Sequence, residues 1–429
     1  MPLRFNLLCL LLFTGVLAMS VSQATAHAPD DSTATATPTT PSVGVQAGEN
    51  GFVIRTDDGQ FQLRVGGDIQ INSQFFDARS EVGAPPAESF YVRRMRALVV
   101  GTVAERFDFR LMPNWGFGQA SLQDAFLNAR FAESFKVRAG KFKPPVGLEF
   151  LQSPNNLFLY ERAYPTGLVP GRDVGVMIYG SVFDQRLDYA AGIFNGPVDG
   201  QSLNVDTNDA KDVMARLFAR PFRTADSVID GIGIGIAATI GDETVGGAGQ
   251  SNLPNYRTPG RQTFFSYRPN AQADGQRTRI APQGYWYAGP FGVMGEYVLS
   301  QQEVRAGEST ADLTNQSWQV SISQVLTGED ASYGRVRPDN PYNGDGQWGA
   351  FELAARLHGI QVDSDAFPTF ANPETTAESA LTWGLGLSWY ATANVRFSAN
   401  YERTTFDSAT DDASFDDEGM FIGRFQIAF

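Results

Sequence analysis

Charged side chains gather in one unusual stretch, residues 140–175, where they could bind or position a charged solute. The stretch contains Lys141, Lys143, Glu149, Glu161, Arg162 and Arg172. It also contains five prolines between residues 143 and 171, which exclude a continuous strand or a long helix. Its many apolar residues are unsuited to a solvated loop or to disorder. We therefore expect a long connection that folds into a cavity enclosed by other elements.

Arginines in the segment 90–101, FYVRRMRALVVG, are a second candidate for binding a charged solute. Alternation along a strand places Arg94 and Arg96 on one face, and Met95 and Ala97 on the other. Two guanidinium groups on one face could attract an anion through charge-assisted hydrogen bonds. A purely structural role is the alternative, because barrel interiors are lined with mixed charges. The residues alone leave both readings open.

Three further arginines, Arg257, Arg261 and Arg268, lie in the 241–274 connection, with Arg277 and Arg279 just after it. They could form an entry funnel for anions. Equally, they could belong to a solvated loop face that nearby acids balance. The acidic run 407–418 lacks the alternating ligand spacing of a calcium loop.

Catalytic and metal-binding chemistry find few residues to use. The single cysteine, Cys9, lies within an N-terminal apolar run, and the chain has two histidines, His27 and His358. Disulfides and thiolate metal sites are therefore excluded from the mature chain. We predict no catalytic residue, no metal and no cofactor. The formal charge of −14 argues against a nucleic-acid partner.

The N-terminal residues 1–28 have the pattern of a signal peptide. Arg4 precedes an apolar run at 7–17, and small residues at 24–28 provide a cleavage site. Residues 29–50 are rich in Thr, Ala, Pro and Ser without periodicity, which predicts a disordered periplasmic segment. Residues 51–429 remain for one folded domain.

From residue 61 onward, apolar and polar residues alternate in runs of about ten, separated by Gly, Asp, Asn and Pro turns. About sixteen such runs extend to the C-terminus. In the last run, Phe421 and Phe425 share one face, while Arg424 and Gln426 share the other. A soluble β-sandwich shows the same alternation. Export, strand length and aromatic residues at strand ends favour a membrane barrel instead.

The chain is therefore predicted to be all-β, a transmembrane antiparallel β-barrel of sixteen strands in the cell outer membrane. Sixteen strands leave an aqueous channel, and the 143–171 connection would fold inward and narrow it. Bacterial barrels have short turns at one end and long loops at the other. The predicted long connections are 143–171, 241–274, 302–312, 328–346, 362–379 and 407–417.

Several sequence strings resemble the phosphate-selective porin O and P family of outer-membrane channels. They are GKFKPPVGLEFLQSPNNLFLYERAYPTGLVPGRDVGV, FYVRRMRALVVGT, LQDAF and GAFELAARL, and the resemblance spans residues 52–429. It implies a homotrimer of sixteen-stranded barrels, each with its third loop bent inward to form an anion-binding constriction. By position, it implies that Arg93 and Arg94 form the constriction pair and that Asp124 orients them. Ser153 and Arg162 would be the polar contributions of the inward loop.

Four positions depart from the family's phosphate channel. Asp68 and Phe150 stand where that channel has an arginine and a lysine, Arg96 replaces a tyrosine, and Pro154 replaces a serine. We therefore expect a passive porin for small anions, with phosphate and polyphosphate as candidates. The alternatives are a general or weakly selective porin, or a surface receptor or adhesin anchored by its barrel. Outer-membrane lipid and the barrel-assembly machinery are the other expected partners.

The resemblance implies that Phe429, which ends an apolar-faced strand, belongs to the C-terminal signal read by the barrel-assembly machinery. Deleting Phe429 should reduce insertion into the outer membrane. The amount of folded, heat-modifiable protein in outer-membrane fractions measures this. Wild-type amounts in the deletion strain would contradict the prediction.

Overall fold

The computed structural model describes residues 41–79, 87–206, 208–224, 227–243, 251–410 and 413–429. One compact unit, Ser42–Phe429, contains every element discussed below. The predicted signal peptide and residues 29–40 of the predicted N-terminal segment lie outside the described residues.

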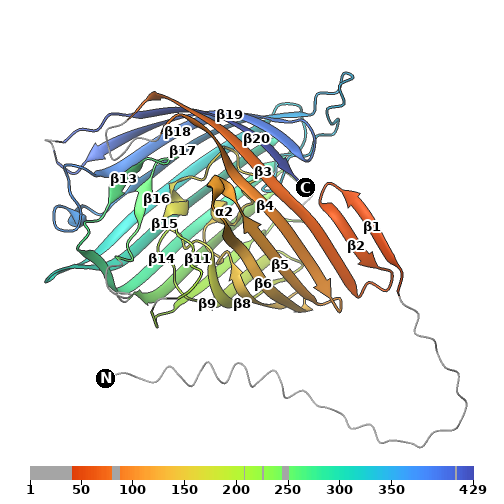
Figure 1. Ribbon diagram of the computed structural model, residues 1–429, viewed down its shortest axis with the longest axis horizontal. Helices are drawn as coiled ribbons and strands as arrows, with labels where there is room; N and C mark the ends of the chain where they lie inside the picture. The colour runs from red at the N-terminus through yellow and green to blue at the C-terminus, as the bar shows by residue number, and fades with distance from the viewer. Residues whose placement is uncertain (1–40, 80–86, 207, 225–226, 244–250, 411–412) are drawn as a thin grey trace, which may run out of the picture. The chain divides into compact units, whose positions relative to one another are not determined.

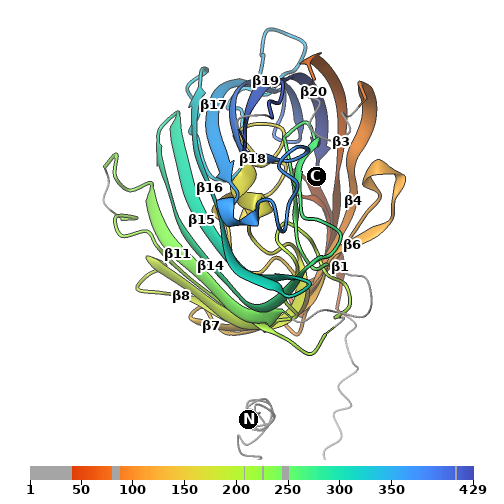
Figure 2. The same ribbon diagram turned by 90° about the vertical axis from the view of Figure 1, so that its left-hand side faces the viewer.

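Sixteen antiparallel strands pair in chain order and close into a barrel (Figures 1 and 2). The barrel closes where β20 (Glu418–Ala428) pairs with β3 (Phe61–Ala78). The other fourteen are β4 (Ser89–Val103), β5 (Phe107–Asn114), β6 (Ser121–Ala132), β7 (Phe135–Phe142), β8 (Asp173–Val182), β9 (Leu187–Phe194), β10 (Asp212–Ala219), β11 (Ile232–Glu243), β14 (Ala271–Ala288), β15 (Phe291–Ala306), β16 (Ser309–Val325), β17 (Ala350–Gln361), β18 (Ala377–Tyr390) and β19 (Val395–Ser408). The predicted sixteen-stranded barrel is confirmed.

The faces of the strands follow the alternation in the sequence. On β20, Phe421 is exposed, whereas Arg424 and Gln426 are buried. On β18, Leu385 is exposed and Ser388 is buried. Hydrocarbon accepts apolar side chains but offers no hydrogen bonds, so a barrel that crosses a membrane turns its apolar face outward and its polar face inward.

A hairpin precedes the barrel. Strands β1 (Val43–Gly48) and β2 (Gly51–Thr56) pair with each other, and β2 continues onto β3, with Phe52 opposite Val65. Beyond this point the same edge of β3 is occupied by β20. A Cβ atom on Gly66 would lie 2.4 Å from the carbonyl oxygen of Phe429, so the close approach requires glycine. Residues 43–48 thus differ from the expected disorder, because strand pairing orders them.

Two of the predicted long connections need correction. The connection at 302–312 is wrong, because β15 and β16 stay paired up to Ala306 and Ser309. Only residues 307 and 308 join them. The connection around 328–346 is long, as predicted, but it does not lie at the same end of the barrel as 143–171. Because successive strands alternate in direction, it lies at the other end, among the short turns. There it contacts the short turn after β18, where the Tyr342 amide donates to the Ala391 carbonyl at 2.7 Å.

The remaining elements are short. They are the hairpin of β12 (Asn255–Arg257) and β13 (Thr263–Ser266), and the helical turns η1 (Gly116–Gly118), α2 (Leu148–Leu151), η2 (Tyr164–Gly167) and η3 (Ser364–Ala366). In the part of the chain that the structure describes, no helix is long and apolar enough to cross a membrane. Both α2 and η2 belong to the connection between β7 and β8.

Leu385 lies near the middle of β18 with about half of its side chain exposed on the outer face. Replacing Leu385 with Arg should lower the free energy of unfolding by about 2–4 kcal/mol, because lipid solvates the charge poorly. Denaturant unfolding of the protein folded in lipid vesicles measures the change. The control is Leu326→Arg, at an exposed position just after β16. Equal effects of the two substitutions would argue against a lipid-facing Leu385.

Candidate functional site

The connection between β7 and β8, residues 143–172, packs tightly against the barrel strands. Leu148, Leu157 and Leu168 are each at most 1% exposed. The yellow segment that carries α2 is seen within the ring of strands in Figure 2. Apolar side chains alone would not fix its orientation, because apolar contacts lack direction. Polar contacts with the strands supply it.

Strands from several parts of the ring anchor this connection. Arg356 of β17 pairs with Glu149 at 3.2 Å, and Glu296 of β15 accepts the Leu148 amide at 2.6 Å. Arg396 of β19 donates to the carbonyl oxygens of Leu157 at 2.8 Å and Phe158 at 3.1 Å. These inward-facing charges therefore have a structural role.

A β-bulge shapes the arginine pair on β4. The β3–β4 register runs from Gln70 opposite Arg94 to Ile71 opposite Val92, which leaves Arg93 as the extra residue. A bulge redirects side chains that strict alternation would send to opposite faces. Arg93 and Arg94 consequently both reach one carboxylate.

That carboxylate is Glu161, in the connection between β7 and β8. Arg93 binds it in a bidentate manner, with Nε 2.6 Å from Oε1 and Nη2 2.9 Å from Oε2. Arg94 lies 3.3 Å from Oε2, and Arg424 of β20 lies 3.2 Å from Oε1. We call these four residues the Glu161 cluster. Although burial acts in the opposite direction, the charges of Arg93, Arg94 and Arg424 hold the pKa of Glu161 well below its ordinary value.

Arg162, predicted to act with this pair, points elsewhere. Its guanidinium donates to the carbonyl oxygens of Glu149 at 3.1 Å and Gln152 at 2.8 Å. These bonds hold the turn that follows α2. The structure therefore does not bring Arg162 into contact with the carboxylate that binds Arg93 and Arg94.

A cavity of about 490 Å³ collects most of the other predicted residues. Asp68, Arg96, Asp124 and Ser153 all line it, together with basic residues that we did not predict. We call it the cationic cavity. Its charged side chains are Arg64, Arg96, Arg110, Arg138, Lys143, Arg172, Arg335, Glu49, Asp68 and Asp124.

Ion pairs neutralise only part of this charge. Asp124 accepts from Arg172 at 2.7 Å and lies 2.9 Å from Arg110, so one carboxylate serves two guanidinium groups. Asp68 lies 3.8 Å from Arg96. Burial and the neighbouring Arg162 and Arg172 lower the pKa of Lys143 well below its usual range. The cavity therefore presents six arginines and Lys143 against three carboxylate side chains.

Sequence reasoning did not single out several charged members of the two sites, namely Glu49, Arg64, Arg110, Arg138, Arg335 and Arg424. It named Arg172 and Glu161 only as part of the charged stretch 140–175, without assigning them to the constriction. Arg424 was already on the inward face by alternation. Asp124 lies opposite Met112 on β5 and pairs diagonally with Arg110, two residues away, so this contact could be predicted only with the register of the two strands. Alternation thus signalled which side chains face inward, but not which of them meet.

The predicted entry funnel is divided. Arg257 and Arg261 are exposed, while Arg268 donates to the Pro368 carbonyl at 2.9 Å. Arg277 and Arg279 are buried in ion pairs with the acids Asp199, Asp212 and Glu243. Acidic neighbours therefore balance these last two arginines. Over the described ranges, no group of His, Cys, Asp and Glu is placed to hold a metal ion.

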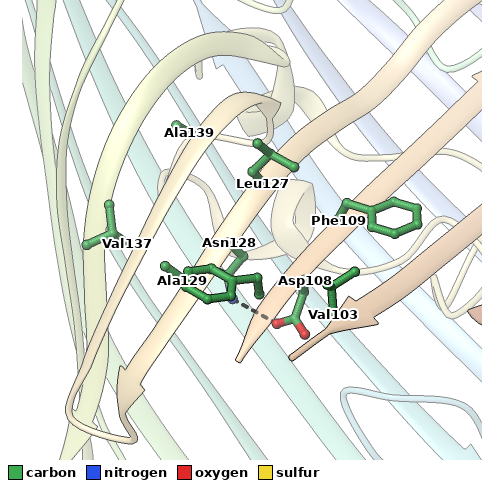
Figure 3. Close-up of a pocket in the computed structure, with 9 residues that line it drawn as sticks. Val103, Asp108, Phe109, Leu127, Asn128, Ala129, Val137 and Ala139 are labelled. Carbon is green, nitrogen blue, oxygen red and sulfur yellow. Dashed lines mark hydrogen bonds between the residues drawn. The ribbon is translucent and has the colours of Figure 1, made fainter. Parts of the chain in front are cut away.

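A shallow apolar depression of about 250 Å³ lies over strands β4 to β7 (Figure 3). Val103, Phe109, Leu127 and Val137 line it. Leu127 is 68% exposed, so this face is available to an apolar neighbour such as lipid. The polar residues Asp108 and Asn128 also line the depression and are hydrogen-bonded to each other at 3.0 Å.

A closed barrel with an apolar exterior and a charged interior is the architecture of bacterial outer-membrane β-barrels. The chain belongs to the phosphate-selective porin O and P family, whose sequence model matches residues 63–429. It is 23% identical over 413 residues to Porin O of Pseudomonas aeruginosa, covering 89% of this chain and 91% of that protein. The predicted family is confirmed, and the protein is an outer-membrane porin.

Solved structures show the same fold. The outer membrane channel DcaP of Acinetobacter baumannii superposes with a TM-score of 0.56 at 8% identity, covering 87% of this chain and 99% of that one. The outer-membrane protein OmpT of Vibrio cholerae gives 0.54 at 12% identity, covering 86% and 98%. At these identities the likeness concerns the fold alone.

Proposed function

We propose that this porin conducts small anions by passive diffusion and that the cationic cavity is its anion-selective region. The observation that carries the proposal is the charge of that cavity, where six arginines face three carboxylates. In a narrow, poorly screened space, each uncompensated charge acts on a passing ion far more strongly than in bulk water. The connection 143–172 narrows the channel at this level, since Lys143, Ser153 and Arg172 belong to both the connection and the cavity.

The geometry supports a weak to moderate preference for anions. Asp124 holds Arg110 and Arg172 in fixed positions, and this contact also reduces the attraction that they exert. Asp68 acts in the same way on Arg96. Phosphate should therefore bind less tightly than in family members that have cations at the positions of Asp68 and Phe150.

Conductance across planar lipid bilayers tests the proposal. Purified protein should give discrete current steps, and the reversal potential in a potassium chloride gradient should lie toward the equilibrium potential of chloride. Cation preference would refute anion selectivity, although the porin would remain a channel. Absence of steps from folded protein would instead favour a barrel that only anchors a receptor or adhesin.

Asp68 provides a direct test of the cationic cavity. Asp68→Arg should shift the reversal potential further toward chloride and lower the phosphate concentration that blocks chloride current. The reason is that a carboxylate 3.8 Å from Arg96 is replaced by a second cation. The matched control is Glu308→Arg, the same change of charge in the exposed turn between β15 and β16. If Asp68→Arg and the control behave alike, the cavity does not set selectivity.

Assembly into a homotrimer is a second part of the proposal. OmpT of Vibrio cholerae has a solved trimer form with a TM-score of 0.53 to this chain at 10% identity, covering 86% of this chain and 99% of that one. The apolar depression over β4 to β7 would suit a neighbouring barrel. Unheated protein should migrate on SDS gels near three times the mass of the heated, monomeric protein. A monomer by light scattering in mild detergent would count against assembly.

A further inference from the structure

We infer that Glu161 is an internal anion, which occupies an anion-binding site formed by Arg93, Arg94 and Arg424 and competes with permeating anions for it. The inference rests on the proposed anion conduction and concerns a site separate from the cationic cavity. None of the four residues lines that cavity. The ligand class is a small oxyanion, either a carboxylate or phosphate.

The contacts of Glu161 are those of a bound anion. Both carboxylate oxygens are shared among three guanidinium groups, which come from β4 and β20. Bidentate binding by an arginine is the usual way in which proteins hold a carboxylate or phosphate. One carboxylate balances only one of the three positive charges, so the site retains attraction for a further or a more highly charged anion.

The barrel holds these arginines in place independently of Glu161. Arg94 donates to the side-chain oxygen of Gln70 at 2.7 Å, and Arg424 donates to that of Asn72 at 2.8 Å. Arg93 lies 5.2 Å from the centre of the Phe117 ring, a favourable cation–π contact. We expect these contacts to hold the three guanidinium groups in a convergent arrangement against their mutual repulsion when the carboxylate is removed.

Access to the cluster is restricted but present. The side chain of Arg93 is 22% exposed and that of Glu161 is 12% exposed, whereas those of Arg94 and Arg424 are at most 4% exposed. A solute would therefore meet Arg93 first, and a small anion could replace the Glu161 carboxylate without entering the barrel wall. Glu161 reaches the arginines from a connection and not from a strand. Its carbonyl oxygen accepts from Arg356 at 2.7 Å, and that of Tyr160 accepts from Arg424 at 2.5 Å. The backbone is therefore anchored, and a solute would displace only the Glu161 side chain.

Removing the charge of Glu161 should expose the site. Glu161→Gln should lower the phosphate concentration that half-blocks chloride current by about tenfold, as expected for one added charge-assisted contact. Glu308→Gln is the matched control for charge and should behave as wild type. Glu161→Asp keeps the charge and should remain close to wild type. An unchanged half-blocking concentration in Glu161→Gln would overturn the inference.

A second variant makes the test independent of phosphate. Glu161→Ala removes the carboxylate and leaves room for a small one. Sodium formate should then block chloride current saturably in this variant, at a concentration about tenfold below that needed in wild type or in Glu308→Ala. Formate acting equally on all three proteins would show that the arginines do not form a vacated carboxylate site.

Two further readouts separate the possible failures. Heat-modifiable migration on SDS gels shows that each variant is folded. If wild type gives no anion-selective steps, the proposed function fails. If wild type gives such steps and both Glu161 variants keep wild-type block by phosphate and formate, only the role of Glu161 fails, and its contacts serve to hold the connection in place.

Discussion

Closure of the sheet is the constraint on which the rest of this structure depends. Lipid offers no partner for a backbone amide or carbonyl, so every strand that crosses the membrane must be paired on both sides. The first and last barrel strands, β3 and β20, meet this requirement by pairing with each other. Where β20 ends, Gly67 exchanges two backbone hydrogen bonds with Phe429, and β2 then continues along the same edge of β3. Closure also gives the protein an interior, and this interior must be filled with polar groups that satisfy one another.

The interior charges of this barrel have two different roles. Arg356 and Arg396 bind a carboxylate and carbonyl oxygens of the connection 143–172 and hold it against the strands. Arg96, Arg110 and Arg172 face a cavity in which carboxylates are too few to balance the basic residues. An arginine that faces inward is therefore not by itself a sign of anion binding. Its counter-ions decide whether its charge is used in holding the fold or remains available to a solute.

Sequence reasoning predicted the barrel well and its interior contacts poorly, for physical reasons. Alternation reports which face a residue occupies, and it placed Arg424 inward correctly. It also placed Arg94 and Arg96 on one inward face correctly. It does not report bulges, so it could not foresee that Arg93 joins Arg94 at Glu161. The partner of Glu161 on β20 is 263 residues away along the chain, and no local pattern links the two. The sequence alone could have predicted at which end of the barrel the 328–346 connection lies. Counted from the first barrel strand, this connection follows an even-numbered strand, and such connections belong to the end with the short turns.

The two clusters hold their acids in different ways, and this difference bears on selectivity more than the number of cations does. Asp124 lies on β6, where backbone pairing with Met112 of β5 fixes its position. It is a permanent counter-ion, since Arg110 and Arg172 cannot lose it without disruption of the sheet. Glu161 belongs to a connection that is held by side-chain contacts, and we infer that a permeating anion competes with its carboxylate. A porin of this kind can therefore change its affinity for anions by moving an acid from a strand to a loop, while the arginines and the barrel stay the same.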